Sequence, residues 1–217
     1  MLKKVLLFHP SFEKGGVTKN LINIVNYLLK KKIVVILLSH NAKRNEFKSN
    51  KNLKIINNKP LKRFFLFPIR WNLALSSMIN LFSCTKANYN NSIIFSMQSH
   101  IPAIIVSIIL KKKIIIRNSE EPIGATIYAD NKFLAILVLI LKFIFYNFAD
   151  RIVAISKKSK ESLKKIVPFN NNVDLILNPY VNKIFKIKKI DKPKNKKFTI
   201  LSVGRFAYQK NLLSLIN

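Results

Sequence analysis

The chain has 217 residues, of which 49% are hydrophobic, 39 are Lys or Arg and only 9 are Asp or Glu. This composition is sufficient for a packed core without disulfides or metals, because a domain of about 150–180 residues would bury roughly 70% of its unfolded surface. The single cysteine, Cys84, excludes an internal disulfide and a Cys-rich metal site, and it favours a reducing compartment.

The net charge of +30 favours anionic partners, which are nucleic acid, nucleotide-sugars or an anionic membrane surface. The alternative is that the basic excess follows from genome composition, because Lys, Asn and Ile are all favoured by A+T-rich codons. Nucleic acid is the least favoured partner. The basic residues are spread along the whole chain, and no known nucleic-acid-binding motif is present.

Short runs rich in β-branched residues alternate with helical patterns. Strands are predicted at residues 3–8, 33–39, 53–56, 93–96, 113–117, 151–155 and 173–177, and helices at 17–31, 69–83, 102–110, 131–148 and 157–167. This alternation predicts the α/β class, with a Rossmann-like parallel sheet covered by helices on both faces. We expect this domain to occupy residues 1–181. A Lys-rich linker would follow at 182–198, and the start of a second domain at 199–217.

The longest apolar segment runs from Phe133 to Ala149 and is interrupted by Lys142. It is shorter than the ~20 residues that span a bilayer, and a lysine near the centre would cost ~2.5–3.5 kcal/mol there. We therefore predict a mostly buried helix rather than a membrane span. Because the first residues lack a signal-peptide pattern, we expect a cytoplasmic location, with peripheral attachment to the inner face of the plasma membrane left open.

Two adjacent glycines, Gly15 and Gly16, lie between the first predicted strand and the first predicted helix. Without side chains they would let the backbone approach a ligand, and the helix N-terminus favours an anion. A tight turn without a ligand is the alternative. The pair fits neither the dinucleotide fingerprint nor the P-loop.

Two polar segments follow predicted strands, at the sheet edge where ligands bind in open α/β sheets. His100 is a candidate to contact a substrate hydroxyl or phosphate, and a ring held by loop backbone is the alternative. Glu120, beside Glu121, is a candidate to accept a proton or a sugar hydroxyl hydrogen bond. The alternative for this pair is an acidic loop that pairs with surrounding lysines.

Two cations, Arg205 and Lys210, follow a further predicted strand that begins at Thr199. They flank the predicted start of a helix with the spacing R-x4-K. A pair of cations at such a place suits a diphosphate.

Taken together, these segments resemble the retaining GT-B glycosyltransferases of family 4. The resemblance rests on GGVTKN at 15–20, IFSMQSHIP at 94–102, IRNSEEP at 116–122, ADRIVAIS at 149–156, LNPYV at 177–181 and LSVGRFAYQKN at 201–211. It implies a first domain that binds a cell-envelope glycan or a lipid-linked acceptor, and a second that binds a nucleotide-sugar donor. Gly16 would lie near the donor phosphates or the acceptor, and Arg205 and Lys210 would hold the leaving diphosphate. The resemblance implies no metal, and no cofactor besides the nucleotide-sugar as co-substrate.

The sequence departs from this family in one respect. The acidic E-x7-E motif of the donor domain is not found up to Asn217, so we expect this chain alone to lack transfer activity. A non-catalytic acceptor-binding module and one half of a split transferase are the alternatives, and a basic nucleic-acid-binding protein is a remote one. The segment 199–217 is expected to be poorly packed, because its strand has no sheet partners.

Overall fold

The computed structural model describes residues 4–13, 15–58, 69–88 and 92–178, together with Leu201, Ser202 and Ser214. The predicted linker at 182–198 lies outside the described residues. So do nearly all of the segment 199–217 and the predicted phosphate-binding pair Arg205 and Lys210.

The described domain is built on one sheet of seven strands in the order β3-β2-β1-β4-β5-β6-β7, and every neighbouring pair is parallel. The strands are β1 (Lys4–His9), β2 (Val34–Ser39), β3 (Leu53–Asn57), β4 (Ser92–Ser96), β5 (Ile114–Asn118), β6 (Arg151–Ala154) and β7 (Val173–Leu175). The seven strands predicted between residues 3 and 177 are confirmed, with ends that shift by at most about two residues. The further strand predicted from Thr199 lies outside the described residues. The predicted α/β class with a Rossmann-like parallel sheet is therefore correct.

Six α-helices and two short 3-10 helices connect the described strands. They are α1 (Gly16–Lys30), α2 (Ile69–Asn88), α3 (His100–Ile109), α4 (Pro122–Ile127), α5 (Lys132–Phe145), α6 (Lys157–Ile166), η1 (Arg44–Glu46) and η2 (Tyr146–Phe148). The five predicted helices are present. A polar cap precedes α6, because Ser156 Oγ accepts a hydrogen bond from the Ser159 amide at 3.1 Å.

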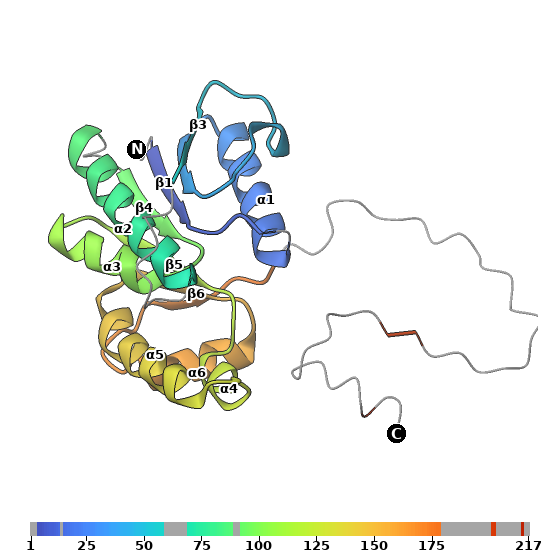
Figure 1. Ribbon diagram of the computed structural model, residues 1–217, viewed down its shortest axis with the longest axis vertical. Helices are drawn as coiled ribbons and strands as arrows, with labels where there is room; N and C mark the ends of the chain where they lie inside the picture. Colours follow the sequence, from blue (N-terminus) through green and yellow to red (C-terminus); the bar gives the residue numbers. More distant parts are fainter. Residues whose placement is uncertain are drawn as a thin grey trace, which may run out of the picture.

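The direction of the connections places helices on both faces of the sheet (Figure 1). The chain steps from β1 to β2 in one direction and from β4 through β7 in the other. Because parallel crossovers are right-handed, α1 covers one face, and α2, α3, α5 and α6 cover the other. The strand order reverses between β1 and β4, and ligands of open α/β sheets bind at the carboxyl edge near such a point.

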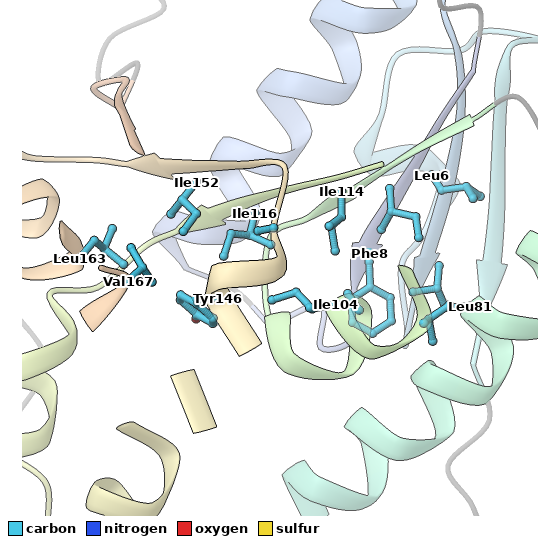
Figure 2. Close-up of a cluster of buried hydrophobic side chains, with 14 of the residues drawn as sticks. Leu6, Phe8, Leu81, Ile104, Ile114, Ile116, Tyr146, Ile152, Leu163 and Val167 are labelled. Carbon is cyan, nitrogen blue, oxygen red and sulfur yellow. The ribbon is translucent and has the colours of Figure 1, made fainter. Parts of the chain in front are cut away.

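Two apolar cores follow from the alternation of side chains along the strands. Val5 and Leu7 point toward α1, whereas Leu6 and Phe8 point toward the opposite helices. The core that contains Leu6 and Phe8 is the larger of the two. Figure 2 shows it, with side chains from the strands packed against side chains from the helices and turns. Its labelled members are Leu6, Phe8, Leu81, Ile104, Ile114, Ile116, Tyr146, Ile152, Leu163 and Val167.

The burial predicted for the apolar segment 133–149 is wrong for most of α5. Phe133 is 82% exposed, and Ile136 and Ile140 are each 51% exposed. The one buried residue of this helix is its lysine, Lys142. An all-round apolar sequence normally indicates burial, but α5 packs on one side only.

Among the described helices, none combines the length and apolar character needed to cross a bilayer.

Candidate functional site

A cavity of about 510 Å³ lies at the carboxyl ends of β4 and β5. Residues from α1, α2, α3 and α5 and from the turn after β5 surround it. Its apolar lining includes Val17, Ala74, Met97, Ile101, Val138 and Leu141, and its polar lining includes Gln98, His100, Asn118, Ser119, Glu120 and Lys142. The cavity therefore offers hydrogen-bonding groups beside an apolar wall, as ligand sites commonly do.

His100 lies in this cavity lining, but its ring is buried and held in place. It is the first residue of α3 rather than part of a preceding loop. Its Nδ1 lies 2.8 Å from Ser96 Oγ, and its ring meets Tyr146 edge-on at 5.8 Å between centroids. Burial is the main cause that lowers the pKa of His100 to about 3, and the positive charges of Lys142 and Arg117 contribute smaller amounts in the same direction. A hydrogen bond with the Arg117 backbone acts in the opposite direction, but it is the weakest of these effects. At neutral pH His100 is thus an uncharged ring that suits positioning better than proton transfer.

Glu120 also lies in the cavity lining and pairs with Lys142 from α5. The Lys142 side chain is only 10% exposed, whereas that of Glu120 is 53% exposed. The suggested pairing of this acidic segment with lysines is therefore observed, although its partner is a buried lysine. The second acid has another role, because the Glu121 carboxylate accepts the Ile123 and Gly124 amides at 3.1 and 2.6 Å and caps α4.

The different exposure of the two charges predicts different effects when either is removed. Glu120→Gln should lower the free energy of unfolding by about 1–3 kcal/mol, because it leaves a buried ammonium without its charged partner. Lys142→Met should lower it by less than about 1 kcal/mol, because water can solvate the remaining Glu120 carboxylate. Urea unfolding of both variants measures the difference, and an equal or reversed order would contradict the pairing.

The turn that carries Glu120 is held by hydrogen bonds from β5 and α6. The Asn118 amide and the Ser159 hydroxyl both donate to the Glu120 carbonyl, the latter at 2.9 Å. Arg117, which is buried, donates to Ser119 Oγ at 2.9 Å and to Asn178 Oδ1. These hydrogen bonds fix the backbone of Glu120 and so limit the positions that its carboxylate can reach.

The Gly15-Gly16 pair borders this site, because the next residue, Val17, contributes to the cavity lining. Gly15 is the N-cap of α1 with extended backbone, at φ 173°. A Cβ added at Gly15 or Gly16 would meet no atom within 4 Å. Because neither the turn nor close packing requires glycine, the open space above the pair is compatible with the suggested ligand approach.

His9 lies beneath the start of α1, at the carboxyl end of β1. Thr18 Oγ1 donates to the Glu13 carbonyl at 2.6 Å, so it accepts from His9 Nε2 at 3.2 Å. His9 Nδ1 is buried and has no hydrogen-bond partner within the described structure. Burial lowers the pKa of His9 to about 4, against a smaller opposing effect of Glu13.

Two further features at the cavity indicate a binding function. Ser99 has φ 50°, in the left-handed region that a non-glycine residue rarely adopts, and such strain gathers at functional sites. Gln98 Oε1 is buried and lacks a hydrogen-bond partner among the residues that the structure describes. A ligand hydroxyl in the cavity could satisfy this acceptor.

The structure thus brings together His100, Glu120 and the neighbourhood of Gly15 and Gly16 at one edge of the sheet. Sequence reasoning did not identify Gln98 or Lys142 as parts of this site. It also did not identify His9, which is buried at the end of β1 and does not line the cavity. The sequence does contain an indication for Lys142, because a single lysine within a long apolar helix needs a charged partner. In the described part of the chain, no three His, Cys, Asp or Glu side chains gather in a way that could hold a metal ion.

The fold is the Rossmann-like arrangement of the N-terminal half of GT-B glycosyltransferases. No known protein-family profile and no curated protein sequence matches the chain. The family-4 assignment accordingly stays a prediction.

Solved structures of sugar-handling enzymes resemble the chain at low identity. Anabaena HepE, in complex with UDP-glucose, is 12% identical with a TM-score of 0.56 over 81% of this chain and 43% of its own. Sucrose-phosphate synthase from Thermosynechococcus elongatus is 13% identical, with a TM-score of 0.59 over 81% of this chain and 48% of its own. Phytolacca americana UGT2, complexed with UDP-2fluoro-glucose and pterostilbene, is 9% identical, with a TM-score of 0.59 over 83% and 55%. The chain spans about half the length of these structures.

Proposed function

We propose that the chain is the acceptor-binding part of a retaining GT-B glycosyltransferase. This enzyme would transfer a sugar from a nucleotide-sugar to a cell-envelope glycan or a lipid-linked acceptor. The observation that carries the proposal is the cavity at the carboxyl ends of β4 and β5, in a fold shared with proteins crystallised with UDP-sugars. Polar and apolar groups lie side by side there, which suits an acceptor that has hydroxyls and an apolar part.

The described side chains suggest a role for each part of the cavity. The half-exposed Glu120 carboxylate and the unpaired Gln98 Oε1 would accept hydrogen bonds from acceptor hydroxyls. Met97, Val138 and Leu141 would contact its apolar part. Arg205 and Lys210 would hold the donor diphosphate, from a second domain that begins after the segment 182–198, and Gly16 would lie close to the donor phosphates or the acceptor.

Filling the cavity should block acceptor binding without unfolding the protein. Ala74→Trp places a large ring at the cavity wall from α2. Leu75→Trp, the matched control on the same helix, changes a side chain that is 48% exposed and does not line the cavity. Calorimetry with octyl glucoside, below its critical micelle concentration, should show at least about tenfold weaker binding for Ala74→Trp, since an indole excludes the ligand from the space it needs. Equal binding by Ala74→Trp and Leu75→Trp would refute the cavity as the acceptor site.

A further inference from the structure

The side of α5 that faces away from the cavity is an exposed apolar surface, and none of the described helices packs on it. It comprises Phe133, Ile136, Leu137, Ile140, Phe143 and Ile144, which are between 40% and 82% exposed. Their spacing follows the helical repeat, so they form one stripe over roughly 16 Å of helix. We call this stripe the outer face of α5. A contiguous apolar surface of this kind marks an interaction site.

The other side of the same helix is occupied. It contacts α3 and α4, and Val138, Leu141 and Lys142 line the cavity. A single helix therefore separates the proposed acceptor site from the outer face. Whatever covers the outer face lies within one helix diameter of the cavity.

The charges around α5 indicate what would cover the outer face. Residues 100–166, which include α3 to α6, contain twelve Lys and Arg against five Asp and Glu. Lys157, Lys158, Lys164 and Lys165 are exposed on α6, and α4 contacts both α5 and α6 (Figure 1). An exposed apolar helix face on a strongly basic domain is typical of proteins that bind the interface of an anionic bilayer.

A second copy of the chain fits this surface less well. Each copy has a net charge of +30, and two such molecules repel each other at close approach. Binding to an anionic lipid surface, in contrast, is favoured by about 1 kcal/mol for each basic residue near that surface. The charge therefore favours lipid over self-association.

We infer that the outer face of α5 docks on an anionic lipid bilayer. The helix lies in the interfacial plane, and its apolar side chains reach roughly 5–10 Å into the boundary between headgroups and acyl chains. The cavity then opens beside the membrane, where a lipid-linked acceptor is concentrated. This inference extends the proposed function by naming the place of its acceptor, but the docking itself requires no sugar.

Vesicle flotation of the full chain tests the docking. The probes are vesicles of phosphatidylcholine with 30% phosphatidylglycerol, and vesicles of phosphatidylcholine alone. We expect binding to the anionic vesicles and at least about tenfold weaker partitioning for the double variant Ile136→Ser/Ile140→Ser, which removes two apolar side chains from the outer face. The matched control Tyr27→Ser/Ile176→Ser changes side chains that are 60% and 57% exposed and lie outside α5, and it should reduce partitioning less than about twofold.

Three results would overturn the inference. These are absence of binding to the anionic vesicles, equal loss of binding in both double variants, or a dimer in light scattering that Ile136→Ser/Ile140→Ser dissociates. The last result would assign the outer face to a second copy. Because the assay contains no sugar, each of these failures leaves the cavity test with octyl glucoside unaffected, and a failed cavity test leaves the vesicle result unaffected.

Discussion

Acidifying the protein from pH 7 to pH 4 is expected to lower its free energy of unfolding by several kcal/mol through two buried histidines. The pKa values of His9 and His100 are lowered from 6.5 to about 4 and about 3. Between these values and 6.5, the unfolded chain binds protons that the folded chain does not bind. Stability is therefore full above pH 6.5 and is lost as the pH falls toward 4, by roughly 3 kcal/mol for each ring.

Urea unfolding at pH 7, 5.5 and 4 measures this loss. His9→Gln and His100→Gln should each reduce the difference in unfolding free energy between pH 7 and pH 4, because glutamine takes up no proton. His40→Gln is the matched control, because the third histidine is only partly buried. If the three variants show the same pH dependence as the unmodified chain, the burial of neutral His9 and His100 is not what makes the fold sensitive to acid.

Phe8→Ala should lower the free energy of unfolding by about 3–5 kcal/mol. Phe8 is fully buried on β1, which pairs with β2 on one side and β4 on the other. Its ring fills the larger core close to Leu81 and Ile104 (Figure 2). Removing it leaves a cavity between the sheet and the helices that the rigid central strands cannot close.

Phe133→Ala is the matched control for this change. The same residue type is 82% exposed there, so the free energy of unfolding should change by less than about 0.5 kcal/mol. Thermal unfolding of the two variants separates a core phenylalanine from a surface one. A large destabilisation by Phe133→Ala would mean that the start of α5 is packed, which would also remove the basis for its outer face.

The sheet could be predicted because its strands carry their own signal. Runs such as residues 33–39 and 113–117 are apolar on both faces, as a parallel sheet covered by helices requires. The structure has β2 and β5 at these positions. The order of these strands is not contained in the runs themselves and comes from their pairing in the structure. Once the order is known, the right-handed crossovers fix which face each helix covers.

Two predictions failed because the same residues are compatible with two different structures. Glu121 and Pro122 form a cap followed by a proline at the first helical position, which is a helix start. Sequence reasoning treated the acids at 120 and 121 as one chemical site and therefore did not identify α4. The prediction that α5 is buried was wrong, because an apolar helix can pack either in the core of its own domain or against a separate partner.

The candidate site was predictable only in part. His100 and Glu120 each follow a strand, so their position at the carboxyl edge could be expected. The ion pair between Glu120 and Lys142 joins residues that are 22 positions apart. The apolar surroundings of Lys142 indicate that it needs a partner, but they do not indicate which acid supplies it. The burial of His100 depends on Tyr146 and Ser96, and such contacts become visible only in three dimensions.

The proposed function requires that the described domain binds the acceptor and not the nucleotide-sugar. Calorimetric titration of the full chain with octyl glucoside and, separately, with UDP-glucose measures both affinities. We expect a dissociation constant on the order of 1 mM for octyl glucoside, which carries the hydroxyls and the apolar part that the cavity suits, and weaker binding or none for UDP-glucose. Tight binding of UDP-glucose without binding of octyl glucoside would place the donor site in this domain and contradict the proposed function.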